Sequence, residues 1–317
     1  MIVFFGSSKY SVPTLKKLSE NSRDIIVVTS GDKPAGRGNK TTPNPLKEFA
    51  QEKKLPILTP KKLDSLALKQ LKEAIGKKLP SLGVCCVYGK IIPENWLKFF
   101  PKGILNIHPS LLPKYRGPSP AQFAILSGEK KMGVSIIKMD SEIDHGPILF
   151  QKEHFIDQRE TSETLFGKLF LLAANNINSI SNRYINGKIN PREQNHSQAT
   201  LTSQISKSDG FINKKAVKLA LGGKSIPKSL LPKIISQPNP EVENFPPEII
   251  NRARRAFTPW PGIFTKVKIT RKGKSEEKNL KIIETKTDGK SLEIKKVQLE
   301  GKTPVTFCQF CSAYQIF

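Results

Sequence analysis

The first third of the chain alternates short apolar runs with amphipathic stretches. The apolar runs cover residues 2–5, 24–29, 56–58, 81–87 and 104–108. The stretches between several of them, for example 45–53 and 63–77, place apolar residues at helical spacing. Strands that alternate with helices form βαβ units, which assemble into a mostly parallel sheet. This alternation therefore predicts an α/β domain, to which we assign residues 1–188, including a longer helix over 161–187.

The composition changes after residue 188. Residues 189–209 are rich in Asn, Gln, Ser and Thr and have little apolar periodicity, which is typical of a surface linker. Residues 210–317 then form a second domain in our interpretation. Two helices are expected in it, at 211–221 and 248–257, and four short strands, at 264–269, 279–286, 291–298 and 305–310. Short strands separated by Gly and Asp turns favour a small barrel.

Two polar residues interrupt the apolar run at 104–108. Asn106 and His108 are two positions apart, so on a strand their side chains point to the same face. The Pro-rich turn that follows ends this strand and leaves His108 near the carboxyl edge of the sheet, where open α/β sheets bind ligands. A single histidine in such a place is more often a hydrogen-bonded structural residue, so the pair alone does not decide between structure and function.

An acidic loop downstream adds to the case for a site. Residues 134–139 read as a strand, and Asp140, Glu142 and Asp144 follow it, ahead of Gly146-Pro147. Such a loop is often only a solvated turn. Here the glycine and the proline restrict the backbone, so a carboxylate could be held near the imidazole of His108 and stabilise its protonated form.

The charge balance is strongly basic. The chain has 52 Lys and Arg against 27 Asp and Glu, a net charge of +25. A polyanionic partner would explain this, because neutralising phosphates releases counterions; a generally lysine-rich proteome is the alternative. We find no apolar span long enough for a transmembrane helix and no signal region at the amino terminus, so we expect a cytoplasmic protein without a membrane partner.

The four cysteines give little support for a metal site. Cys85 and Cys86 lie in an apolar run and are expected to pack in the core. Cys308 and Cys311 have the spacing of half a zinc site, but no second pair of cysteines or histidines accompanies them. We therefore predict that the chain binds no metal.

The motif around these polar residues resembles that of the folate-dependent formyltransferases. The resemblance rests on Asn106-x-His108, on Ser-Leu-Leu-Pro-x-x-Arg-Gly at 110–117 and on the later Asp144. It extends to 2–7, to Asp-Lys-Pro-Ala-Gly-Arg-Gly at 32–38 and to Arg-Ala-Phe-Thr-Pro-Trp-Pro-Gly at 255–262, which resemble the branch that acts on charged initiator tRNA. The resemblance implies a Rossmann-like catalytic domain followed by an OB-like barrel, with 10-formyltetrahydrofolate as formyl donor. We further expect a monomer.

The resemblance also implies roles for single residues. In formyl transfer, Asn106 and His108 would stabilise the negative charge on the formyl oxygen, while Asp144 would pair with His108 and accept the proton of the amine. The folate pocket would contain Tyr88, Gly89, Ser110, Leu111, Leu112, Pro113, Asp140, Glu142 and Ile143. The tRNA would contact Lys33, Arg37, Lys40, Lys214, Lys215, Lys218, Arg254 and Arg255, and Arg37 matches the key arginine of the family's acceptor-stem loop.

Three other functions remain open at this level. A formyltransferase for a small amine, such as an amino sugar nucleotide or a purine precursor, would use the same three residues but would not need the basic loop around Arg37. A nucleic-acid-binding protein with a degenerate first domain would not need Asn106, His108 and Asp144 together. A folate hydrolase could use the trio but would not need a basic second domain.

Overall fold

The computed structural model describes residues 1–35, 40–271 and 274–314. Within them the chain forms two compact units. The amino-terminal unit comprises residues 1–117, 131–155 and 166–201, and the carboxy-terminal unit comprises 118–130, 156–165 and 202–317. The segments 118–130 and 156–165 precede the predicted boundary at residue 188 but group with the carboxy-terminal unit. The boundaries of independently folding domains stay a prediction.

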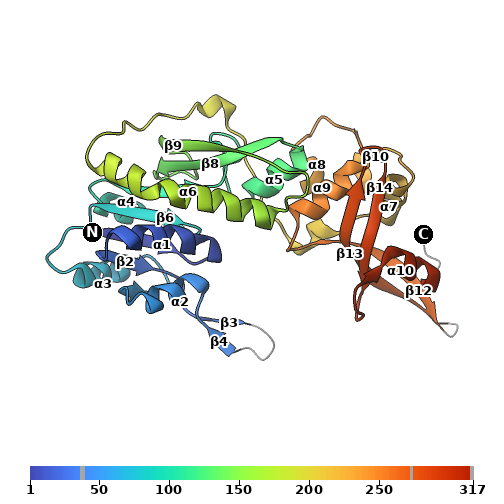
Figure 1. Ribbon diagram of the computed structural model, residues 1–317, viewed down its shortest axis with the longest axis horizontal. Coiled ribbons are helices and arrows are strands. Elements are labelled where there is room, and N and C mark those ends of the chain that lie inside the picture. Colours follow the sequence, from blue (N-terminus) through green and yellow to red (C-terminus); the bar gives the residue numbers. More distant parts are fainter. Residues whose placement is uncertain (36–39, 272–273, 315–317) are drawn as a thin grey trace. The chain divides into compact units, whose positions relative to one another are not determined.

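A seven-stranded sheet with the order β5-β2-β1-β6-β7-β8-β9 forms the centre of the amino-terminal unit (Figure 1). Its strands are β1 (Ile2–Gly6), β2 (Ile25–Val28), β5 (Ile57–Leu58), β6 (Leu82–Cys86), β7 (Ile104–His108), β8 (Lys131–Lys138) and β9 (Ile148–Phe155). The other elements of this unit are α1 (Val12–Asn21), β3 (Lys33–Ala35), β4 (Lys40–Thr42), α2 (Pro45–Glu52), α3 (Ser65–Ile75), α4 (Glu94–Phe99) and most of α6 (Ser162–Ile185).

The first five strands of this order pair in parallel, and the last two join the sheet through antiparallel pairing. Parallel pairing joins β5, β2, β1, β6 and β7 in turn, whereas β8 pairs antiparallel with both β7 and β9. The predicted mostly parallel α/β sheet is therefore confirmed. The antiparallel strands extend the sheet beyond β7, so β7 is an interior strand whose carboxyl end adjoins both the parallel and the antiparallel part.

The core of this unit explains why its strands appear in the sequence as continuous apolar runs. Every residue of β6 is buried, because helices cover both faces of a parallel sheet. Phe5 of β1 makes edge contacts with the rings of Tyr88, Trp96 and Phe100 at centroid distances of 5.7–6.0 Å. Burial raises the pKa of the Cys86 thiol to about 12 and raises the pKa of Cys85 as well. Both thiols are therefore protonated at neutral pH and pack as small apolar groups.

Side-chain caps fix where several helices begin. The amide oxygen of Asn44 accepts hydrogen bonds from the backbone N–H groups of Leu46 and Lys47 at the start of α2. Asp64 caps α3 by accepting from Ala67 N at 2.9 Å. These caps satisfy N–H groups that have no partner within a helix, so each helix starts at a defined residue after its strand.

The carboxy-terminal unit contains a four-stranded antiparallel sheet of order β12-β13-β14-β15. The strands are β12 (Ile263–Arg271), β13 (Lys274–Thr287), β14 (Leu292–Leu299) and β15 (Val305–Thr306). The remaining elements are α5 (Pro120–Ser127), α7 (Lys214–Leu221), β10 (Ile226–Pro227), α8 (Lys233–Ser236), β11 (Asn244–Phe245), α9 (Glu248–Ala256) and α10 (Phe307–Tyr314). An antiparallel β unit therefore follows the Rossmann-like sheet, as predicted.

The last predicted strand is wrong over most of its length. Residues 305–310 were expected to be extended, but β15 ends at Thr306 and Phe307 begins α10. The helix begins here because Thr306 and Gln309 cap it. Gln309 N donates to Thr306 Oγ1 at 3.2 Å, and Thr306 N donates to Gln309 Oε1 at 3.1 Å. This reciprocal pair is a capping box, a helix-start signal that outweighs the β-propensity of the preceding residues.

Candidate active site

Strand β7 positions the first two predicted site residues. Asn106 is paired with Cys85 of β6 on one side and Ile137 of β8 on the other, and His108 is paired with Ser135 of β8. The two side chains therefore lie on one face at the carboxyl end of an interior strand. His108 is almost fully buried, with 6% of its side chain exposed. The expected period-2 geometry is present, and it places an amide and an imidazole side by side.

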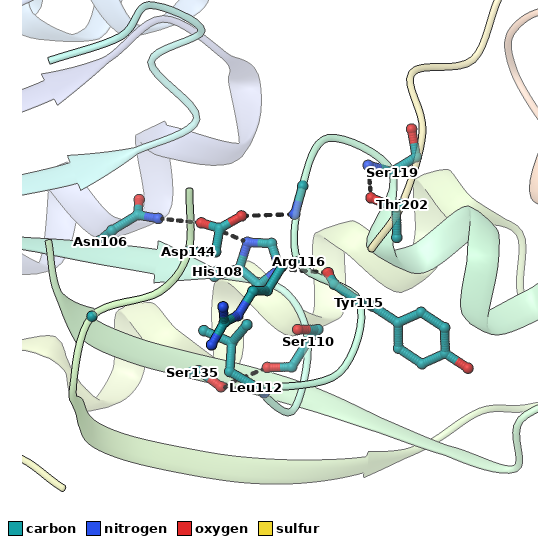
Figure 2. Close-up of polar contacts among 12 residues, drawn as sticks. Asn106, His108, Ser110, Leu112, Tyr115, Arg116, Ser119, Ser135, Asp144 and Thr202 are labelled. Atoms are coloured by element: carbon teal, nitrogen blue, oxygen red, sulfur yellow. Dashed lines mark hydrogen bonds and ion pairs between the residues drawn. The ribbon is translucent and has the colours of Figure 1, made fainter. Parts of the chain in front are cut away.

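The carboxylate of Asp144 joins these two side chains (Figure 2). Asn106 Nδ2 donates to Asp144 Oδ1 at 3.2 Å, and His108 Nδ1 lies 3.3 Å from the same oxygen. The backbone N–H of Gly117 donates to Asp144 Oδ2 at 2.8 Å. Asp144 is 12% exposed, so this carboxylate is shielded from water but satisfied by groups from two segments of the chain.

The contacts of His108 define where its protons belong. His108 Nε2 lies 2.9 Å from the carbonyl oxygen of Tyr115, which only accepts hydrogen bonds, so Nε2 carries a proton. His108 Nδ1 faces an acceptor too, the carboxylate of Asp144. The doubly protonated imidazolium would turn an N–H toward each of these two acceptors, and its charge would pair with the carboxylate. A group of this kind can stabilise negative charge or release a proton on demand.

Two residues at the site, one of them a member of the trio, have left-handed backbone conformations. Asp144 has a φ of 51° and Tyr115 has a φ of 59°. Aspartate tolerates this region better than most residues, whereas a tyrosine there is uncommon. Backbone strain of this kind persists where surrounding contacts over-determine the conformation, and it clusters at functional sites.

The Ser-Leu-Leu-Pro turn is held by the antiparallel strands. Ser135 of β8 donates to the carbonyl of Ser110 at 2.6 Å and accepts from the N–H of Leu112 at 3.1 Å. Gln151 of β9 donates to the carbonyl of Leu112 at 2.8 Å. Leu112 itself is buried against Ile137 and Ile148. These contacts give the turn a structural role; the predicted folate contacts of residues 110–113 stay a prediction.

The other predicted folate residues differ in exposure. Ile143 is 72% exposed and Glu142 is exposed, while Asp140 accepts a hydrogen bond from His145 Nδ1 at 2.7 Å. Gly89 is exposed, but Tyr88 is a core residue that packs on Phe5, and burial raises its pKa to about 12. The Tyr88 side chain therefore supports the sheet from within, and any folate contact there is left to its backbone.

The predicted tRNA residues fall into three groups. Lys33 and Lys40 belong to β3 and β4, and Arg37 lies outside the described residues. Lys214, Lys215 and Lys218 belong to α7, whose opposite face is buried through Ala216, Val217 and Ala220. Arg254 and Arg255 belong to α9. Arg255 is only 6% exposed, and its guanidinium donates to the carbonyl of Glu160 at 3.1 Å, which favours a packing role for it.

Two residues that the sequence analysis did not assign also belong to the site. Arg116 is buried, and its guanidinium donates to Gln194 Oε1. Gln194 Nε2 in turn donates to the carbonyls of Asp144 and Gly146. Arg116 stands in the quoted motif, so the motif offered a signal for it. Gln194 lies within the segment expected to be a surface linker, where no pattern marks it as buried.

The described residues contain neither a helix suited to cross a membrane nor a cluster of metal ligands. None of the described helices combines the length and apolar character that a membrane crossing requires. In the same part of the chain, no three His, Cys, Asp or Glu side chains gather in a way that would hold a metal ion.

Gly146 offers a direct test of how tightly the Asp144 loop is packed. A Cβ at this position would lie 1.8 Å from the carbonyl oxygen of Lys138, a backbone atom that cannot move aside. We expect Gly146→Ala to destabilise the protein by about 1–3 kcal/mol, as overpacking does. Urea unfolding followed by circular dichroism measures this. Gly167→Ala is the control, because no heavy atom lies within 4 Å of its Cβ position; equal midpoints for the two variants would contradict the packing of this loop.

Comparisons with known proteins agree with this geometry. Residues 1–176 match the formyl transferase family. The methionyl-tRNA formyltransferase of Chloroflexus aurantiacus is 36% identical over 265 residues, which cover 83% of this chain and 75% of that protein. A methionyl-tRNA formyltransferase structure from Clostridium thermocellum superposes with a TM-score of 0.56 at 18% identity, covering 94% and 97% of the two chains. The sugar 3N-formyl transferase WlaRD, solved with dTDP and 5-N-formyl-THF, gives 0.60 at 19% identity over 95% and 98%, so the fold is common to both kinds of enzyme. The chain belongs to the formyl transferase family, and it has methionyl-tRNA formyltransferases among its relatives of 34–41% identity.

Proposed function

We propose that this chain transfers the formyl group of 10-formyltetrahydrofolate to the free α-amino group of methionyl initiator tRNA, for translation initiation. The observation that carries the proposal is the contact of Asp144 with both Asn106 and His108 at the carboxyl end of β7. Family membership supplies the reaction class, and the trio supplies groups suited to it. The folate donor is supported by a fold neighbour that was solved with 5-N-formyl-THF.

The reaction forms one new bond to the formyl carbon, from the amine nitrogen, and breaks another, to the folate nitrogen. The neutral amine attacks the formyl carbon, and the formyl oxygen becomes negatively charged in the tetrahedral intermediate. The bond to the folate nitrogen then breaks, and this nitrogen takes up a proton as it leaves. The enzyme therefore needs donors for the oxygen, an acceptor for the amine proton and a proton source for the leaving nitrogen.

Each member of the trio fits one of these needs. Asn106 donates one N–H to Asp144, and its amide carries a second N–H that can donate to the developing oxyanion. In its imidazolium form, His108 can donate to the same oxygen and return a proton to the leaving nitrogen. Asp144 can accept the amine proton, directly or through water. In the free protein these groups bond to one another, so substrate binding has to exchange some of these bonds for bonds to the reacting atoms.

The tRNA partner is supported by charge. The chain carries a net charge of +25, and Lys215 and Lys218 project from the exposed side of α7. A phosphate backbone is the polyanion that such a surface would attract. An enzyme with this partner works where translation takes place, and we propose the cytoplasm. That the chain acts as a monomer, and that Arg37 contacts the acceptor stem, stay predictions from the sequence.

A sugar N-formyltransferase is the second candidate, because the fold of WlaRD is as similar as that of the tRNA enzyme. The sequence relatives at 36% identity favour the tRNA substrate. The two functions are separated by one comparison, in which charged initiator tRNA, charged elongator tRNA and a dTDP-linked amino sugar are offered with the same formyl donor. Faster formylation of the sugar than of initiator tRNA would favour the second candidate.

Loss of either donor should nearly abolish formyl transfer. We expect Asn106→Ala and His108→Ala each to lower kcat about 100- to 1000-fold, the usual effect of removing an oxyanion donor. Single-turnover formylation of charged initiator tRNA measures the rate. His154→Ala is the control. His154 is paired with Met132, three residues along β8 from Ser135, the partner of His108, and is thus about 10 Å away along the strand. Near-normal turnover in His108→Ala would refute the assigned role.

Lysines on α7 should contribute through charge alone. We expect Lys215→Ala and Lys218→Ala to weaken binding of initiator and elongator tRNA alike, and each to reduce the slope of log K against log salt by about 1. Filter binding across a salt series measures this, with Lys53→Ala, in the amino-terminal unit, as a charge-matched control. An unchanged salt slope in both variants would exclude α7 from the tRNA contact.

A further inference from the structure

Gln194 is a buried side chain near the candidate site whose amide is hydrogen-bonded on both its nitrogen and its oxygen. It is 5% exposed, although its neighbours Glu193 and Asn195 are exposed. Its Nε2 donates to the carbonyl oxygens of Asp144 at 2.9 Å and Gly146 at 2.7 Å. Its Oε1 accepts from the Arg116 guanidinium, at 2.7 Å from Nη2 and 3.2 Å from Nε. A primary amide offers two N–H groups and an oxygen with two lone pairs, and all four positions are used.

The partners also fix the orientation of this amide. The two carbonyls only accept hydrogen bonds and the guanidinium only donates them, so the nitrogen must face the carbonyls and the oxygen must face Arg116. No other uncharged side chain of this length offers donors and an acceptor in that arrangement. Glutamate at this position would keep the bond to Arg116 but would turn an oxygen toward the two carbonyls.

Gln194 thereby joins the two segments that meet at the Asp144 carboxylate. One segment is the loop of Asp144 and Gly146, which it holds through the backbone. The other contains Arg116, and the next residue, Gly117, donates its N–H to Asp144 Oδ2. The Asp144 carboxylate is therefore held in two ways: through the backbone of its own loop and through Gly117, which donates to it. The Gln194 amide contacts both segments.

The loop has a conformation that needs such support. Asp144 has a φ of 51°, in the left-handed region. Conformations of this kind are maintained when surrounding contacts over-determine them. The two bonds from Gln194 hold the backbone at Asp144 itself and at Gly146, two residues later. Without these two bonds both carbonyls would lose the Gln194 donor, and relaxation of the loop toward an ordinary backbone geometry would become more favourable.

We propose that Gln194 is a positioning residue for formyl transfer: it fixes the Asp144 carboxylate against Asn106 and His108, through the loop backbone and Arg116, without contacting the reacting atoms. The proposal rests on the proposed function, because it assigns Asp144 a part in that reaction. A displacement of about 1 Å at a reacting group can cost about 100-fold in rate. Gln194 should therefore control turnover while leaving substrate binding almost unchanged.

Two substitutions separate positioning from general packing. Gln194→Glu keeps the size and the bond to Arg116 but loses both donated hydrogen bonds, and Gln194→Met removes all four. We expect kcat to fall about 10- to 100-fold in each, with the KM values for the formyl donor and for charged tRNA changed by less than about threefold. Gln198→Glu, an exposed position four residues along, makes the same charge change and should retain kcat within about twofold.

A double-mutant cycle tests whether the effect passes through Asp144. In single turnovers with Asp144→Asn as the background, Gln194→Glu should cost less than about threefold, because the carboxylate that it positions is already gone. An equal loss in both backgrounds, or kcat as high as in the Gln198→Glu control, would overturn the proposal.

A readout that does not depend on activity completes the test. The Gly117 amide proton is bonded to Asp144 Oδ2, so its hydrogen exchange, measured by NMR, reports directly on the position of the carboxylate. We expect exchange at Gly117 to accelerate about tenfold or more in Gln194→Glu and to stay unchanged in Gln198→Glu. Unchanged protection of Gly117 in Gln194→Glu would overturn the positioning role, whether or not the wild-type chain formylates tRNA.

Discussion

The Asp144 carboxylate is the contact on which the site depends. It accepts hydrogen bonds from the Asn106 amide and the Gly117 backbone, and it lies beside His108 Nδ1. A shielded carboxylate is costly unless such partners surround it, and here they come from a strand end and from the turn that follows it. The negative charge therefore does two things at once: it brings together the groups that the proposed chemistry needs, and it fixes the turn between β7 and α5 against the loop after β8.

The rest of the amino-terminal unit keeps this carboxylate in place. Pairing with β6 and β8 makes β7 an interior strand, which is buried except at the partly exposed Asn106. Strands β8 and β9 hold the Ser-Leu-Leu-Pro turn through Ser135 and Gln151. The motif residues are thus partly structural: Ser110 donates to the carbonyl of Lys114 and so closes its own turn. A substitution in this turn would change the position of the trio even if it removed no group that touches a substrate.

The sequence could predict what depends on local pattern. Alternating periodicity gave the parallel sheet, and the two-residue spacing gave the shared face of Asn106 and His108. Asp144 followed from resemblance, because no local rule indicates that a loop 36 residues after His108 folds back onto it. Gln194 was missed for the same reason: its partners are backbone carbonyls about 50 positions away, and backbone partners leave no trace in side-chain patterns. The Thr306 and Gln309 pair could have indicated a helix start, but the apolar residues around it favoured the prediction of a strand.

The most direct test of the account is the ¹⁵N spectrum of His108, which is accessible because the chain has only 4 histidines. The geometry predicts that Nε2 carries a proton, since it faces the Tyr115 carbonyl, and that the Nδ1 resonance moves when Asp144 is replaced by Asn. The other three histidines provide the assignment by single replacement. A His108 signal that does not respond to Asp144→Asn, or a neutral ring protonated on Nδ1 alone, would contradict the central contact and with it the proposed enzyme.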